Sequence, residues 1–177
     1  YLLEALARLE AGGRLKAMDL VLFVCGEPAF MRGEAYGRRL LEAAGRLKRF
    51  RVIFPGYLSG TAKRAHLRLA ELFISPSVHE SYGLTIVEAM QAGLPVLASD
   101  HYGVDELLRP EYGRTVAYGE PGRRVERLAE AIAALLADPG ALREMGAAAR
   151  AAAEDMSFPK TASRLLDEAL GLLGDAR

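Results

Sequence analysis

The sequence contains no tryptophan and only one cysteine, Cys25, in 177 residues. A lone cysteine excludes an internal disulfide and a zinc site built on paired cysteines. Its position in the apolar stretch LVLFVCG predicts a small, buried core residue. The absence of a disulfide framework leaves the redox compartment open, and it is compatible with the cytoplasmic location that we expect.

An excess of charge of either sign is also lacking, because 23 Lys and Arg balance 23 Asp and Glu. We therefore expect no nucleic-acid partner. No apolar run approaches the roughly 18 residues of a membrane span, so we expect no transmembrane segment, while peripheral membrane contact stays open. Most basic residues are Arg, a weak sign of a GC-rich bacterial genome. The remaining composition, 51% hydrophobic and 26% charged, is typical of one globular domain.

Short apolar stretches alternate with helical patterns along the chain. We predict strands over residues 19–26, 51–56, 71–77, 94–99 and 113–118, the first of them buried on both faces. Predicted helices cover residues 1–13, 33–50, 61–70, 84–93 and 104–108, and C-terminal helices cover 123–173. Such alternation favours right-handed βαβ units, so the predicted fold class is α/β, a doubly wound parallel sheet in a single domain, residues 1–177.

Three helix boundaries have specific signals. Ser59 or Thr61 should cap the helix over 61–70, and Ser157 should cap the last helix. The tail should divide at Asp138-Pro139-Gly140.

Ligands of doubly wound sheets bind at the carboxyl ends of the strands. Here these ends are CGEP, FPGYLSG, SPSVHESYG and ASDHYG, which are rich in Gly, Pro, Ser and His. The third of them leads through Gly83 into a helix, whose first backbone N–H groups lack partners and can hold an anion such as a phosphate. We therefore expect the ligand site at this edge.

Two glutamates, Glu80 and Glu88, lie on this segment with seven residues between them. Glu88 stands among apolar residues of the predicted helix, where an unpaired carboxylate is costly to bury. It must accept hydrogen bonds, and the vicinal hydroxyls of a ribose are a natural donor pair. The pattern indicates a nucleotide site with amides for the diphosphate and Glu88 for the ribose.

The segment SPSVHESYGLTIVEAMQAGLPVLASD resembles the donor-binding segment of the family 4 (group 1) retaining glycosyltransferases, which have the two-domain GT-B fold. Their two glutamates with seven residues between them correspond to Glu80 and Glu88, their Gly-x-Pro-Val strand to GLPVLAS, and their Gly-x-x-Glu turn to residues 103–106. VIFPGYLS and LFVCGEP agree with neighbouring segments of the family. The resemblance covers nearly the whole chain. It implies that the chain corresponds to the C-terminal, Rossmann-like donor domain of these two-domain enzymes.

The resemblance implies a role for each site residue. Glu80 contacts the donor sugar at the reacting centre as the catalytic residue, and Glu88 binds the ribose. The remaining donor-binding positions are Ser81, Tyr82, Gly83, Leu84 and Thr85 for sugar and diphosphate, Tyr57 and Leu58 for the base, and Gly26 on the phosphate side. The partners implied are a nucleotide-diphosphate sugar and a carbohydrate or other small-molecule acceptor, with no cofactor and no metal.

The sequence departs from the family pattern in several places. Tyr1 already stands in the predicted first helix. Judged by the resemblance, we expect this chain to lack the preceding strand, an Arg and a Lys that neutralise the leaving diphosphate, and the N-terminal acceptor domain. We expect that strand between those over 19–26 and 71–77, and we expect the isolated chain to be inactive. Tyr102 replaces a usual Gly, and Tyr82 replaces a common Phe.

Some alternatives stay open. His79 either contacts the sugar or bonds to backbone in a turn, and we favour the turn. His101 and Tyr102 are expected as exposed loop residues, and Glu106 either contacts the ligand or serves only its short helix. Rival functions are a glycoside hydrolase using Glu80 and Glu88, a non-catalytic nucleotide-sugar binding module, and a sugar-nucleotide epimerase-like domain.

Overall fold

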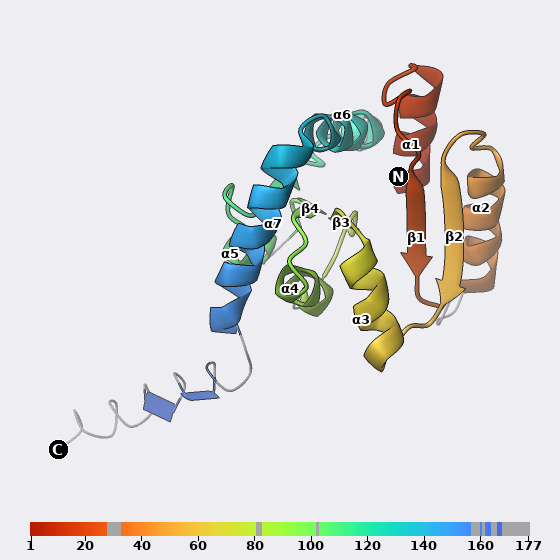
Figure 1. Cartoon of the computed structure of the whole chain (residues 1–177). Helices are drawn as coiled ribbons and strands as arrows, with labels where there is room; N and C mark the ends of the chain where they lie inside the picture. Colours follow the sequence, from red (N-terminus) through yellow and green to blue (C-terminus); the bar gives the residue numbers. More distant parts are fainter. Residues whose placement is uncertain are drawn as a thin grey trace.

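The computed structural model describes residues 1–27, 33–80, 83–101 and 103–156, together with residues 160, 162, 163, 166 and 167; the side chain of Glu106 is outside this description. Within it, five parallel strands form two sheets (Figure 1). One sheet pairs β1 (Val21–Cys25) with β2 (Arg51–Gly56). The other has the order β3 (Phe73–Ser75), β4 (Val96–Ser99) and β5 (Gly113–Val116).

The helices connect and cover these strands. They are α1 (Leu2–Ala11), α2 (Gly33–Gly45), α3 (Gly60–Leu69), α4 (Leu84–Gln91), α5 (Val104–Leu107), α6 (Arg124–Leu136) and α7 (Pro139–Ala153), with 3-10 turns at Pro121–Arg123 and Glu154–Met156. The α/β class and the five predicted strands are confirmed, and so is the parallel pairing.

β1 and β3 are not paired with each other within the described residues. Each therefore has one edge without a strand partner there, and Figure 1 shows α3 running beside this division. The expectation that a further strand lies between them stays a prediction.

The burial of β1 differs from the prediction. Val21 and Cys25 at its two ends are exposed, and the residues between them are half-buried. The predictions of a strand buried on both faces and of a core cysteine are therefore wrong. The physical reason is that β1 stands at the edge of a two-stranded sheet, whereas β4, between two strands, is buried throughout.

The predicted division of the C-terminal helices is confirmed. The side chain of Asp138 accepts hydrogen bonds from the N–H groups of Gly140 and Ala141, both at 3.0 Å, and caps α7. Ser59 occupies the N-cap position of α3, as one of the two predicted candidates, but its side chain makes no capping hydrogen bond. Ser157 lies outside the described residues.

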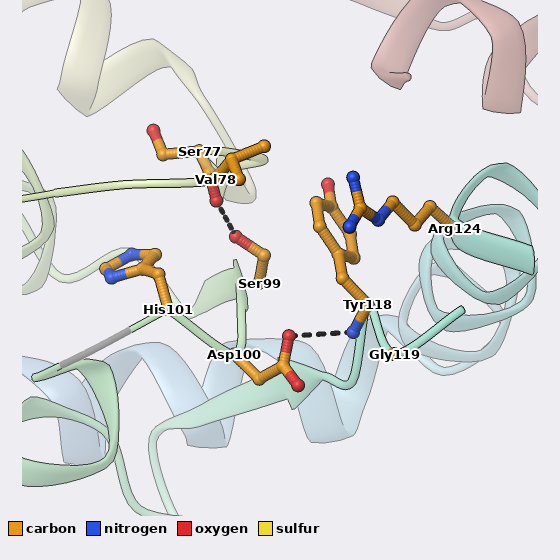
Figure 2. A pocket seen from close by; sticks show the side chains of 8 residues that line it. All are labelled: Ser77, Val78, Ser99, Asp100, His101, Tyr118, Gly119 and Arg124. Atoms are coloured by element: carbon orange, nitrogen blue, oxygen red, sulfur yellow. Dashed lines mark hydrogen bonds between the residues drawn. The ribbon is translucent and has the colours of Figure 1, made fainter. Parts of the chain in front are cut away.

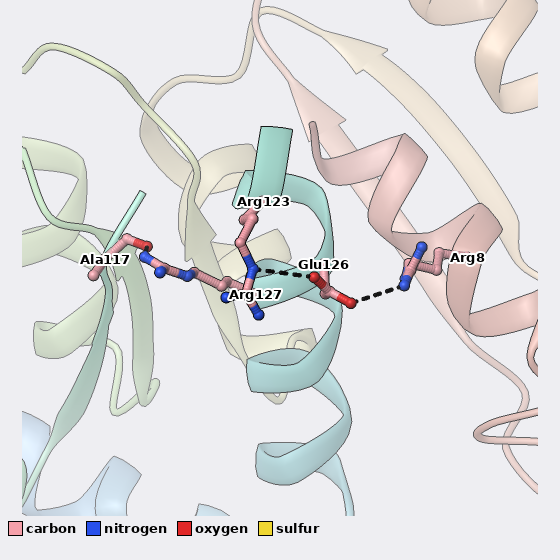
Figure 3. A network of polar contacts seen from close by, with 5 residues as sticks. All are labelled: Arg8, Ala117, Arg123, Glu126 and Arg127. Atoms are coloured by element: carbon pink, nitrogen blue, oxygen red, sulfur yellow. Dashed lines mark hydrogen bonds and ion pairs between the residues drawn. The ribbon is translucent and has the colours of Figure 1, made fainter. Parts of the chain in front are cut away.

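One apolar cluster joins the two sheets. It contains Leu9 of α1 and Ile132 of α6, and Leu22 of β1 and Leu97 of β4 pack into it from the two sheets. Beside it, Glu126 of α6 pairs with Arg8 of α1 at 3.0 Å and with Arg123 at 3.4 Å (Figure 3). Side chains from both sheets thus pack into a common apolar cluster.

Candidate functional site

The helix that follows β3, α4, begins at Leu84 directly after Gly83, as the sequence predicts. Gly83 has φ +62° and stands at the N-cap of α4, where no side chain caps the helix. A Cβ at this position would lie 2.7 Å from Cδ1 of Leu107. The left-handed backbone and this close approach explain a glycine here. They leave the first-turn amides of α4, at Leu84 and Thr85, without a side-chain cap.

Glu88 lies one turn into α4 and has a partner that sequence analysis did not identify. Lys63 of α3 donates from Nζ to Oε1 of Glu88 at 2.5 Å. The two side chains are 40% and 38% exposed, respectively. Glu88 is therefore not a buried carboxylate, as its apolar sequence neighbours suggested, but half of an ion pair that solvent reaches.

The expected base and phosphate segments come together at the ends of β1 and β2. The N–H of Gly26 donates to the carbonyl of Gly56 at 2.9 Å. Both glycines have positive φ, and a Cβ on either would meet nothing within 4 Å, so the backbone is open on that side. Tyr57 is 70% exposed, and Leu58 is half-buried.

The loop after β3 is described in part. His79 is exposed and Glu80 is half-buried, while Ser81 and Tyr82 lie outside the described residues. His101 is only 8% exposed, so the prediction of an exposed loop histidine is wrong. It lies two residues after the end of β4, lines the pocket described below, and its carbonyl accepts from the N–H of Val104. Tyr102 lies outside the described residues.

A polar pocket of about 180 Å³ opens at the carboxyl ends of β3, β4 and β5 (Figure 2). It is lined by Ser77, Val78, Ser99, Asp100, His101, Tyr118, Gly119 and Arg124. The hydroxyl of Ser99 donates to the carbonyl of Ser77, and Asp100 accepts from the N–H of Tyr118 at 2.7 Å. These bonds tie the ends of three strands together beside the segment that carries Glu80.

Two residues that line this pocket, Tyr118 and Arg124, also contact the ring of Tyr1. Arg124 lies 5.6 Å from the ring centroid of Tyr1 and 5.7 Å from that of Tyr118, and the rings meet edge to face. Its Nη1 donates to the hydroxyl of Tyr1 at 3.1 Å. Burial raises the pKa of Tyr118 to about 12, with a further rise from Tyr1 and Asp100 and an opposing effect of Arg124. Tyr118 is therefore a neutral donor at physiological pH.

The structure brings the predicted residues to one side of the sheets. Gly26, Tyr57, Glu80 and Gly83 all follow the carboxyl ends of parallel strands, and Glu88 lies one turn farther. Sequence analysis missed Lys63. It lies in the first turn of the helix after β2, and the first turns of helices after parallel strands share one edge of the sheet, so this position was a usable signal.

This arrangement offers hydrogen bonds and charge rather than metal ligation. In the described part of the chain, no group of three His, Cys, Asp or Glu side chains could hold a metal ion. Over the same residues, no helix is long and apolar enough to span a bilayer. The expectations of a reaction without metal and of a cytoplasmic location stay predictions.

Solved glycosyltransferases have the same fold. HepE of Anabaena in complex with UDP and glucose matches with a TM-score of 0.75 and 24% identity, over 96% of this chain and 43% of that one. A glycosyltransferase of Rickettsia africae matches with a TM-score of 0.76 and 21% identity, over 97% and 43%. Sucrose-phosphate synthase of Thermosynechococcus elongatus matches at 0.72 and 24%, over 99% and 43%. The fold is therefore the Rossmann-like α/β fold found in GT-B glycosyltransferases.

Sequence comparisons agree with this fold. A D-inositol 3-phosphate glycosyltransferase of Salinispora tropica is 30% identical over 94% of this chain, and one of Nocardia farcinica is 40% identical over 56%. The chain spans 34% and 22% of the lengths of these relatives. The sequence profile described as glycosyl transferases group 1 matches residues 1–152. Because that match covers most of its length, the chain belongs to the group 1 glycosyltransferases.

Proposed function

We propose that this chain is the C-terminal, donor-binding half of a retaining glycosyltransferase, which transfers a sugar from a nucleotide-diphosphate sugar to an acceptor. The observation that carries the proposal is the placement of Glu88. Glu88 lies near the carboxyl ends of the strands, one turn into α4. This helix follows Gly83, and its first backbone amides have no side-chain cap. One edge thus offers a carboxylate for hydroxyl groups and amides for an anion.

The comparisons support a nucleotide sugar as donor. HepE has been solved with UDP, with UDP and glucose, and with UDP-glucose. The relatives named above are glycosyltransferases that act on D-inositol 3-phosphate. The structural likeness lies at the level of the fold, and the curated relatives are longer than this chain, so we extend donor binding to it as a hypothesis.

Each group would act on a different part of the donor. Glu88 accepts hydrogen bonds from the ribose diol, and the backbone amides of Gly83, Leu84 and Thr85 hold the diphosphate. Glu80 contacts the sugar near the anomeric carbon, where it stabilises charge as the bond to the diphosphate breaks. The open backbone at Gly26 and the chain at Tyr57 and Leu58 would hold the phosphate side and the base, respectively.

A pair of titrations tests this division of roles. UDP, GDP and ADP are first compared by calorimetry, and the tightest ligand is kept. Glu88→Ala should weaken its binding by about 1.5–3 kcal/mol, the range for hydrogen bonds to a charged group. Glu80→Ala should leave diphosphate affinity nearly unchanged, because Glu80 meets only the sugar. Equal losses in the two variants would refute the assignment.

The isolated chain should bind nucleotide but transfer no sugar. This expectation separates a donor-binding half from a complete enzyme, because transfer needs an acceptor site and cations on the leaving diphosphate. Transfer from the preferred nucleotide sugar is measured with purified residues 1–177, and turnover would contradict the expectation. A glycoside hydrolase would instead cleave aryl glycosides, which serves as the control for that rival.

A further inference from the structure

The ion pair between Lys63 and Glu88 joins α3 and α4, the helices that follow β2 and β3. Lys63 belongs to the helix after β2, and Glu88 belongs to the helix after β3, so the pair bridges strands that lie in different sheets. Its 2.5 Å contact uses only Oε1 of Glu88. Within the described residues, Oε2 of Glu88 accepts no hydrogen bond from the protein, which leaves that oxygen available to a ligand hydroxyl.

Stability alone is a weak explanation for this contact. Both side chains are more than a third exposed, and ion pairs of that kind contribute little to folding. The adjacent cation on α3, Arg64, makes no such ion pair with any described residue. Arg64 is exposed and donates to the hydroxyl of Thr61 at 3.1 Å, without contact to an acidic side chain in the described structure.

A nucleotide-sugar site at this edge has an electrostatic conflict. The same edge must hold a diphosphate, which is an anion, and a carboxylate that accepts the ribose hydroxyls. Charges closer than the Debye length, about 10 Å at 0.1 M salt, repel with little screening when the site is partly desolvated. An unpaired Glu88 would therefore oppose the ligand that it is meant to bind.

We propose that Lys63 is a positioning residue of the donor site, which neutralises Glu88 and fixes its carboxylate so that the site accepts a ribose and a diphosphate together. This inference rests on the proposed donor-binding function and deepens it. Lys63 holds Oε1, the ribose diol donates to the remaining lone pairs of the carboxylate, and the pair carries no net charge toward the diphosphate.

The proposal separates the effect on anionic ligands from the effect on neutral ones. Lys63→Met keeps the length of the side chain and removes its charge. It should weaken binding of UDP, or of whichever diphosphate binds best, by about tenfold, while affinity for the matching uncharged nucleoside should change less than about threefold. Lys63→Arg keeps the charge and should retain most of the diphosphate affinity.

A control and a double variant complete the experiment. Arg64→Met removes the same charge one residue away and should weaken diphosphate binding clearly less than Lys63→Met. Glu88→Gln weakens the hydrogen bonds to the ribose, and in the Lys63→Met background it also removes an uncompensated negative charge. It should therefore cost less diphosphate affinity in the Lys63→Met background than in the wild-type chain. Calorimetry at two salt concentrations gives all affinities, and circular dichroism with urea unfolding checks that each variant is folded.

The outcomes distinguish this inference from the function on which it rests. If the wild-type chain binds none of the three diphosphates, the proposed function fails and the role of Lys63 fails with it. If the wild type binds but Lys63→Met matches Arg64→Met, only the inference is overturned. Equal losses for nucleoside and diphosphate would also overturn it, because Lys63 would then contact the nucleoside directly.

Discussion

At Gly83, both the backbone conformation and the packing disfavour a side chain. Its φ of +62° is unfavourable for other residues, and an added Cβ would lie 2.7 Å from Leu107. Gly83→Ala should therefore lower the free energy of unfolding by roughly 1–3 kcal/mol. Urea unfolding measures the change. Gly122→Ala is the matched control, because a Cβ there meets nothing within 4 Å and its φ is not in the left-handed region; an equal loss in both variants would contradict this explanation.

Tyr118 gives a prediction about alkaline pH. Its folded pKa of about 12, raised first by burial, exceeds the value of about 10 expected for tyrosine in the unfolded chain. The stabilising difference is fully present below pH 10, and it is lost as the pH rises from about 10 through about 12. The urea midpoint should fall over this interval.

Tyr118→Phe serves as the control for this pH effect. The variant should show a smaller fall of the midpoint between pH 10 and 12, and the tyrosinate absorbance of the folded protein should lose a late-titrating component. A midpoint that falls equally in both proteins would show that other groups cause the alkaline loss.

At the scale of helices, two cap positions differ in their hydrogen bonds. Asp138 accepts from two N–H groups of α7, whereas Ser59 makes no side-chain cap bond at α3. Asp138→Ala should cost about 1 kcal/mol of unfolding free energy, and Ser59→Ala should change it by less than about 0.5 kcal/mol. Thermal or urea unfolding of the two variants checks this, and a larger effect at Ser59 would be the contrary result.

Strands and helices were predictable because each depends on local pattern. The apolar stretch at β4 and the break at Asp138-Pro139-Gly140 carry their own signals, and the structure has both where the sequence indicates them. Burial at β1 was not predictable in the same way. An apolar strand looks the same whether its neighbours cover it or not, and the exposure of Cys25 depends on which strands pair with β1.

The candidate site was predictable only as far as topology determines it. Parallel strands bring Gly26, Glu80 and Gly83 to one edge whatever their side chains do. The partner of Glu88 required knowledge of packing, because Lys63 lies 25 residues earlier on another helix. The prediction for His101 was likewise wrong, because its burial depends on tertiary packing that the local sequence does not show.

At the scale of the whole molecule, the two sheets share no strand pairing in the described residues, yet one apolar cluster receives side chains from both. Leu9 is 2% exposed and lies in the cluster that side chains of β1 and of β4 both enter. Packing of this kind couples the two sheets without hydrogen bonds between them. Loss of a shared buried side chain removes packing contacts from both sheets and so destabilises both. The two sheets should therefore unfold together.

Leu9→Ala tests this coupling. The variant should lose about 2–5 kcal/mol of unfolding free energy, the cost of deleting a fully buried leucine side chain. Circular dichroism and tyrosine fluorescence should still report one coincident transition, shifted to lower urea. Leu69→Ala, at a leucine that is 74% exposed on α3, is the control and should change stability by less than about 0.5 kcal/mol. Two separate transitions in the wild-type chain would show that the sheets unfold independently, and the shared cluster would then be too weak to join them.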